Sequence, residues 1–195
     1  MSSNPVLEAI RTRRVVRALT DEPVGRAQLE DILKAGRWAP SGGNRRLHRY
    51  VAVHDPLTLR LLRMVSPGML QKPQAIVLIC IDWQRVGAYG LSSTSTGLYV
   101  DVGTAAQTML LAAHSLGLAS GIVTSFPKAG VRAVLNLPAQ LSPELFVCLG
   151  HAAPGGPAPM RTWGKITWQS LVDWERFPGT PSAAPEPAQA ESERL

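Results

Sequence analysis

The sequence is poor in cysteine and has no long hydrophobic run, and each shortage excludes a class of protein. Cysteine occurs only as Cys80 and Cys148, each inside an apolar stretch. Buried free thiols are therefore expected, and neither a disulfide framework nor a metal site is implied. No apolar run reaches membrane-spanning length, and the first residues lack the apolar core of a signal peptide, so a cytoplasmic protein is expected.

Aromatic residues are also scarce and make up 6% of the chain. Lysine is scarce as well, with four residues among 195. The 45% hydrophobic and 17% charged residues are ordinary for a single soluble domain. The net charge is +6, and 16 of the 20 basic residues are arginine, with eleven of these before residue 64. Because arginine favours planar, bidentate contacts, this local excess points towards phosphate or carboxylate ligands.

The stretch RTRRVVRAL, residues 11–19, holds four of these arginines and allows several interpretations. A solvated helix face is the plainest. Nucleic-acid binding would require interleaved aromatics or a known module, and a membrane patch would require a longer amphipathic helix than this one. The glycine-rich phosphate loops GxxxxGK[ST] and GxGxxG are missing, so a phosphate bound here would be held by side chains.

Periodicity and turn residues predict mixed helices and strands, and therefore an α/β or α+β class with a layered sheet. Residues 15–19 are expected to be extended, 41–44 to form a flexible loop and 83–97 a mobile excursion. Residues 98–117 are apolar almost all round, so a central helix that is buried on all sides is expected there. Residues 1–177 are interpreted as one domain, with a tryptophan-bearing arm at 160–177 and a disordered tail at 178–195. Helices are predicted at residues 4–14, 26–39, 56–65, 98–117 and 127–138. Strands are predicted at residues 49–53, 74–82, 121–126 and 144–152.

Five segments taken together resemble the FMN-dependent nitroreductase family. They are RRVVRAL, DEPV, ILKAGRWAPSGGN, VDVGTAAQTMLLAAHSLGL and VDWERF, and the resemblance runs from about Val6 to Phe177. It implies an α+β fold with three α-β-α layers and a mixed, mainly antiparallel central sheet. It also implies an obligate homodimer with two FMN molecules at the interface and a C-terminal arm that wraps onto the partner subunit.

The resemblance also implies a set of cofactor contacts. Arg13 would contact the FMN phosphate or ribityl chain, while Arg14 and Arg17 would lie near the ribityl chain and the N1/O2 edge. The PSxxN loop beginning at Pro40 would come from the other subunit. The backbone of Val123 and Thr124 would face the N5 edge of the flavin. The full set implied is Arg13, Arg14, Val15, Arg17, Pro40, Ser41, Gly42, Asn44, Val123, Thr124, Arg161 and Lys165.

The sequence departs from the family pattern at several of these positions. Val15 replaces the serine of RRSxRxF, and His48 replaces the tryptophan of NxQPW, so the polarity of the pocket is open. His48 is either a substrate contact or proton donor, or a loop histidine without a chemical role. Tyr89 and Tyr99 are candidates to line the substrate channel. No catalytic triad is present, and hydride transfer at the flavin N5 requires none.

The function that the resemblance implies is an FMN oxidoreductase with ping-pong kinetics. NADH or NADPH would reduce the flavin, and a nitroaromatic, a quinone or a similar small oxidant would reoxidise it. Residues 60–82 also resemble the flavin subunit of cyclodipeptide oxidases, which dehydrogenate a peptide-like substrate and work with a small partner protein. A flavin-fragmenting enzyme and a non-enzymatic basic binding module are further alternatives.

Overall fold

The computed structural model describes residues 4–155 and 167–175. These fall into two units, one ending at residue 159 and the other beginning at residue 160, and each is described by itself. In the second unit a short 3-10 helix, η2 (Trp168–Leu171), is followed by Val172 and Trp174, both exposed. The predicted tail at 178–195 lies outside the described residues, and the domain boundary at 177 stays a prediction.

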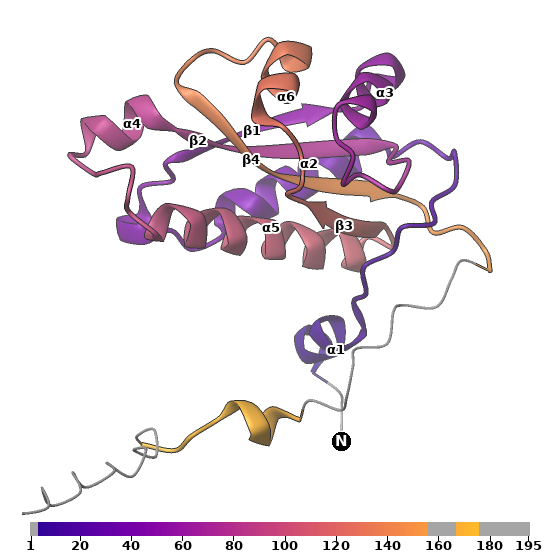
Figure 1. Ribbon diagram of the computed structural model, residues 1–195. Coiled ribbons are helices and arrows are strands. Elements are labelled where there is room, and N and C mark those ends of the chain that lie inside the picture. Colours follow the sequence, from indigo (N-terminus) through magenta and orange to yellow (C-terminus); the bar gives the residue numbers. More distant parts are fainter. Residues whose placement is uncertain (1–3, 156–166, 176–195) are drawn as a thin grey trace, which may run out of the picture. The chain divides into compact units, whose positions relative to one another are not determined.

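The larger unit is built on a four-stranded antiparallel sheet with the order β1-β2-β4-β3 (Figure 1). Its strands are β1 (His48–Val53), β2 (Ala75–Asp82), β3 (Ala119–Val123) and β4 (Leu141–Gly150). An isolated parallel bridge joins Val15 to Ser120 beside β3. The predicted α+β class with a mainly antiparallel sheet is confirmed.

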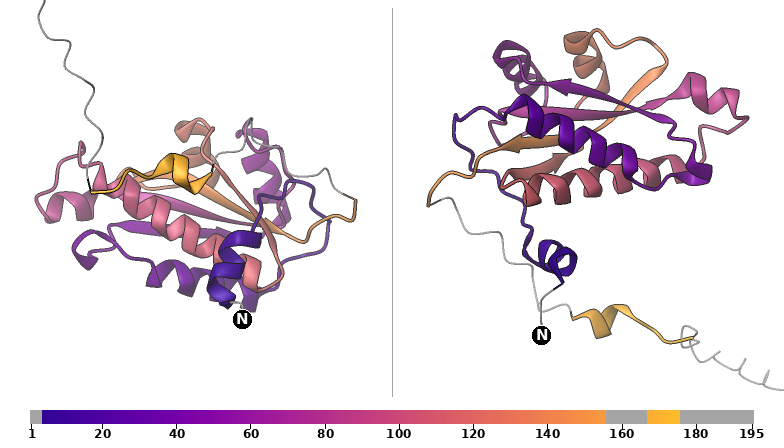
Figure 2. Two further views of the ribbon diagram at one scale, coloured as in Figure 1. Left: turned by 90° about the horizontal axis from the view of Figure 1, so that it is seen from below. Right: turned by 180° about the vertical axis from the view of Figure 1, so that it is seen from behind.

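Helices cover both faces of this sheet, as Figures 1 and 2 show. Helices α2 (Arg26–Trp38) and α5 (Gly97–Ser115) lie on one face, and α3 (Pro56–Met64) and α6 (Lys128–Leu135) lie on the other. The buried residues accordingly form two hydrophobic clusters, one for each face. The structure therefore has the predicted three layers.

Strand β2 shows how the sequence produces this arrangement. All eight of its residues are buried, as the near-continuous apolar run predicts. Successive side chains of a strand point to opposite faces, so the run supplies both clusters. Ala75, Val77, Ile79 and Ile81 pack towards α2 and α5, whereas Ile76, Leu78 and Cys80 pack towards α3 and α6.

Local signals set most helix ends correctly. The Asn4 side chain caps α1 (Pro5–Thr12) by accepting hydrogen bonds from the Val6 and Leu7 amides. Helix α2 ends at Trp38 before Pro40, and Gly117 follows α5 with a φ of +75°.

Two expectations about the region from 83 to 117 are wrong. The predicted mobile excursion begins with a helix, α4 (Trp83–Ala88), because the Asp82 carboxylate accepts a hydrogen bond from the Arg85 amide at 3.2 Å. Helix α5 is not buried all round, since Val100 is 62% exposed and only one face of the helix meets the sheet.

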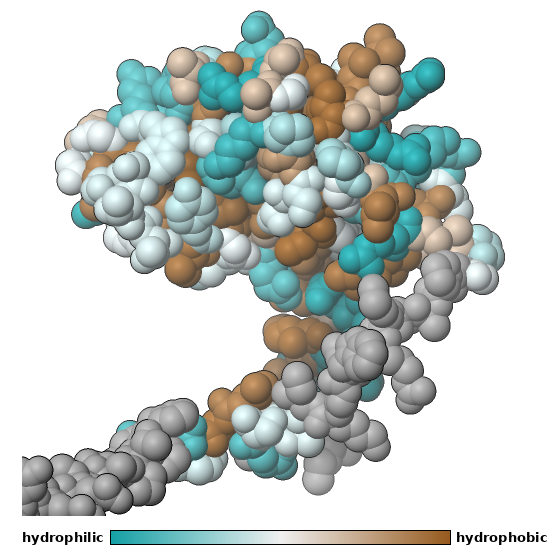
Figure 3. Space-filling model, in the orientation of Figure 1, coloured by the Kyte–Doolittle hydropathy of each residue, from teal (hydrophilic) through white to brown (hydrophobic). Residues whose placement is uncertain are grey.

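The outer surface of the larger unit is mixed in character. On the face seen in Figure 3, hydrophilic and hydrophobic residues are interspersed. None of the helices within residues 4–155 and 167–175 has the length and hydrophobicity of a membrane-spanning segment.

Candidate functional site

The arginine-rich segment is fixed along the outer side of β3. Helix α1 ends at Thr12, and the chain then runs extended, as predicted. The Val16 amide donates to the Ser120 carbonyl at 3.2 Å, and the Thr20 amide donates to the His151 carbonyl at 2.9 Å. These backbone bonds hold the segment that carries Arg13, Arg14 and Arg17 in one position relative to the sheet.

The three arginines differ in what their guanidinium groups contact. Arg14 donates from Nη1 to the carbonyls of Arg11 at 2.6 Å and Arg13 at 2.9 Å, so it closes the end of α1. Arg17 is exposed, and makes no salt bridge within the described residues. Arg13 is half-buried, and its Nη1 is buried without a hydrogen-bond partner in the part of the chain that the structure describes. A buried donor on a cation is costly unless it meets an acceptor, so this geometry favours an anionic ligand at Arg13.

Gly121 on β3 packs closely against Val15, in the segment that carries the arginines. A Cβ at this position would lie 3.2 Å from Cγ1 of Val15 and 3.7 Å from Nε2 of Gln71. Gln71 is buried, and so is the Cys148 thiol, whose pKa is raised to about 12 by burial. Gln71 and Gly121 were not predicted from the sequence, because Gln71 stands among other polar residues in QKPQ, just before the apolar run of β2, and no local pattern sets it apart.

Val123 and Thr124 lie at the far end of the same strand. Val123 is buried and Thr124 is exposed. The following residue, Ser125, accepts a backbone hydrogen bond from Gly68 at 3.2 Å. A Cβ at Gly68 would lie 2.6 Å from both Cβ and the carbonyl oxygen of Ser125, so only glycine permits this approach.

The loop after α2 is anchored to α5. The Gly42 amide donates to Oδ1 of the buried Asp101 at 2.9 Å, and Oγ1 of Thr104 donates to the Pro40 carbonyl at 3.0 Å. Residues 42–44 form a 3-10 turn, η1 (Gly42–Asn44). The prediction of a flexible loop is therefore wrong, because two side chains of α5 hold its backbone.

The arginines and this loop lie at different ends of α5. Thr12, next to Arg13, contacts Nε2 of His114 through its hydroxyl at 2.9 Å, whereas the loop contacts Asp101. Thirteen positions separate Asp101 from His114, which corresponds to about 20 Å along an α-helix. One protomer therefore does not bring the two predicted halves of the cofactor site together.

His48 takes part in a buried hydrogen-bonded chain. Its Nε2 lies 2.8 Å from the Tyr50 hydroxyl, which itself donates to the Gly36 carbonyl at 2.9 Å. Because tyrosine has one hydroxyl proton, His48 donates from Nε2, and its buried Nδ1 has no partner among the described residues. Burial lowers the pKa of His48 and raises that of Tyr50 to about 12. This geometry supports the interpretation of His48 as a structural residue.

The two tyrosines proposed for the substrate channel are each about half exposed. Tyr89 lies beside the loop, because the Arg45 guanidinium carbon is 5.1 Å from the centre of its ring. Tyr99 lies in the first turn of α5, two positions before Asp101. Arg161 and Lys165 lie outside the described residues.

Comparison with known proteins identifies the class to which this fold and site belong. Residues 10–151 match the model of the nitroreductase family, so the chain belongs to this family. It is similar to the FMN reductase [NAD(P)H] of Bacillus subtilis, with 29% identity over 168 residues that cover 77% of this chain and 67% of the relative. It is also similar to a candidate NADH dehydrogenase/NAD(P)H nitroreductase of Methanothermobacter thermautotrophicus, with 29% identity over 161 residues, 78% of this chain and 80% of the relative.

A solved structure extends the similarity to three dimensions. The crystal structure of a candidate nitroreductase from Desulfovibrio desulfuricans, in complex with FMN, has a TM-score of 0.75 and 31% identity. The match covers 91% of this chain and 100% of that one. The nitroreductase fold expected from the sequence is thus confirmed.

Proposed function

We propose that this member of the nitroreductase family is an FMN-dependent oxidoreductase that uses NADH or NADPH to reduce small oxidants. Nitroaromatic compounds and quinones are the substrate classes proposed. The names of the relatives support this, because they include an FMN reductase acting with NAD(P)H and an NAD(P)H nitroreductase. The FMN-bound neighbour supports the choice of cofactor.

The observation that carries the cofactor assignment is the unpartnered Nη1 of Arg13. A phosphate oxygen of FMN would satisfy this donor with a charge-assisted hydrogen bond. The exposed Arg17 would place a second cation near the N1/O2 edge, where it stabilises negative charge on the reduced ring. Arg14 would add charge while its Nη1 stays on two backbone carbonyls. When bound, FMN supplies hydride transfer through N5 between the nicotinamide and the oxidant.

We also propose a homodimer, which the separation of the two halves of the site supports. The loop at Pro40–Asn44 and the segment at Arg13 are anchored about 20 Å apart on α5, so the loop would serve the cofactor of the partner. The exposed Leu171, Val172 and Trp174 support the proposal that the arm at 160–177 packs on the partner subunit.

The test is a visible absorption spectrum of the purified protein, recorded before and after NADH or NADPH is added under argon. A yellow protein that either nucleotide bleaches supports a reductase, and reoxidation by nitroarenes and quinones then defines its substrates. A yellow protein that neither nucleotide bleaches refutes the reductase and favours the cyclodipeptide oxidase-like alternative. A colourless protein that does not bind added FMN refutes the flavin assignment.

A further inference from the structure

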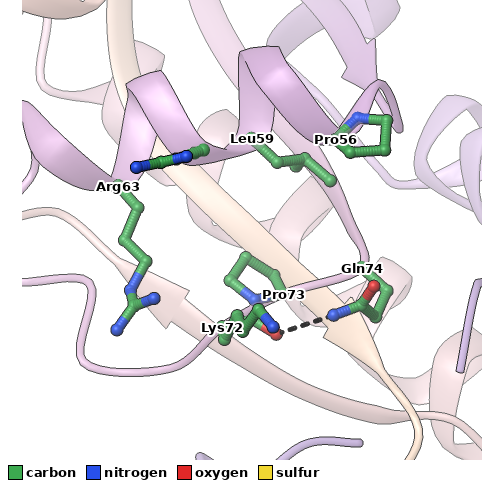
Figure 4. Close-up of a pocket in the computed structure, with 7 residues that line it drawn as sticks. Pro56, Leu59, Arg63, Lys72, Pro73 and Gln74 are labelled. Carbon is green, nitrogen blue, oxygen red and sulfur yellow. Dashed lines mark hydrogen bonds between the residues drawn. The ribbon is translucent and has the colours of Figure 1, made fainter. Parts of the chain in front are cut away.

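A basic hollow lies on the other side of the sheet from α5, at α3. Figure 4 shows it between this helix and the segment that leads into β2. Its volume is about 390 Å³, within the range of small-molecule pockets. The residues that line it are Pro56, Leu59, Arg60 and Arg63 from α3, and Lys72, Pro73 and Gln74 from the segment before β2.

The floor of this hollow is apolar and built into the core. Leu59 and Pro73 are both buried, and in Figure 4 they face the hollow from its two sides. The Pro56 ring extends the apolar surface at the start of α3. Since Pro73 and Pro56 are rigid rings and Leu59 packs in the core, the floor has a fixed shape and suits a flat or branched apolar group.

The rim is cationic and has few counter-charges. Arg60 and Arg63 are three positions apart on α3, so they lie on one face of the helix, and neither makes a salt bridge within the described residues. Lys72 pairs with Asp21 at 2.6 Å, but both side chains are mostly exposed. The carboxylate of Asp55 is taken up by the amide and hydroxyl of Thr58 at the start of α3.

We propose that this hollow binds a small carboxylic acid with an apolar body, such as an aromatic acid. The carboxylate would accept hydrogen bonds from the guanidinium groups of Arg60 and Arg63, whose planar donors match it. The apolar body would lie between Leu59 and Pro73. A bare anion would use only the rim, so the apolar floor is what selects an organic acid. The site shares no residue with the flavin cradle and does not depend on the proposed reductase function.

The experiment is calorimetric titration of the purified full-length protein with benzoate, acetate and inorganic phosphate. The test variant is R60Q/R63Q, and the matched control is R26Q/R37Q, which removes two exposed arginines from α2. We expect benzoate to bind about tenfold or more weakly to the test variant than to the wild type and the control. We also expect acetate and phosphate to bind the wild type about tenfold or more weakly than benzoate does.

Amide NMR of the same samples locates the binding. Benzoate is expected to shift the amide signals of Leu59, Lys72 and Gln74 in the wild type but not in the test variant. Three results would overturn the proposal: no saturable binding of benzoate, equal binding by the wild type and R60Q/R63Q, or phosphate binding as tight as benzoate binding. The last result would mean that the rim attracts any anion.

Discussion

Replacing Arg13 by methionine tests the proposed phosphate cradle most directly. Arg13→Met keeps an unbranched apolar side chain and removes the cation whose Nη1 has no hydrogen-bond partner among residues 4–155 and 167–175. A hydrogen bond to a charged group contributes about 1.5–3 kcal/mol. Since about 1.4 kcal/mol corresponds to a factor of ten in affinity, FMN binding is expected to weaken by about 10- to 140-fold.

The same variant is expected to weaken FMN binding without lowering the stability of the FMN-free protein. In the FMN-free protein the guanidinium of Arg13 is half-buried and its Nη1 meets no acceptor from the described residues, so removing it takes away a desolvation cost of about 1–3 kcal/mol. The free energy of unfolding of the FMN-free variant is therefore expected to equal or exceed that of the wild type. With FMN bound, the variant is expected to be the less stable protein, because its cofactor is held more weakly.

Two measurements test the expected changes in FMN affinity and in stability. Quenching of FMN fluorescence gives the dissociation constant, and urea denaturation of the FMN-free protein gives the free energy of unfolding. Arg26→Met, at an exposed position on α2, removes one positive charge outside the predicted cofactor contacts and should leave FMN affinity unchanged. Wild-type FMN affinity in Arg13→Met would refute the reasoning. So would a loss of more than about 1 kcal/mol in the FMN-free protein, since that would mean Arg13 serves the fold.

Three further predictions follow from contacts and burial. Gly68→Ala is expected to destabilise the protein by about 1–3 kcal/mol in urea denaturation, because its Cβ would meet Ser125 at 2.6 Å. The control is Gly87→Ala on α4, where the added Cβ would meet open space, and it should stabilise the protein by a few tenths to about 1 kcal/mol. The pKa of His48 is lowered in the folded state, so stability should fall as the pH drops below about 6.5, and His48→Gln should flatten this dependence in pH-resolved melts. Because burial raises the pKa of Cys148 to about 12, its thiol should react with an aromatic disulfide at pH 8 only after unfolding, and rapid labelling of the native protein would contradict the placement.

Much of the fold could be predicted because its signals are local. The apolar run of β2 predicts a strand that serves two cores, and Asn4 and Pro40 set helix ends through contacts within a few residues. The Ser/Thr/Gly-rich region after residue 83 led to the wrong prediction. Its first turn is helical because Asp82, which also ends β2, caps it, and the composition of the whole window conceals this single residue.

The site could be predicted only in part, because its supporting contacts are distant in the sequence. The extended course of residues 15–19 follows from their β-branched side chains. The contact that immobilises the loop joins Gly42 to Asp101, which are 59 residues apart, and no local pattern reports such a pair. Likewise, the arginine pattern does not show which guanidinium lacks a partner, since that depends on which carbonyls the fold brings near Arg14 and Arg13.

The backbone shape of the loop at 41–46 has a consequence for how fast a ligand can be captured. Gly43, Asn44 and Arg46 all have left-handed φ angles, between +50° and +58°, and the Arg46 amide donates to Oγ of Ser41 at 3.2 Å. The conformational entropy of these residues is therefore lost when the chain folds, before any cofactor arrives. The loop would therefore already be ordered when a partner protomer binds. FMN association is expected to follow a single fast phase in stopped-flow traces, without a slower step for loop ordering.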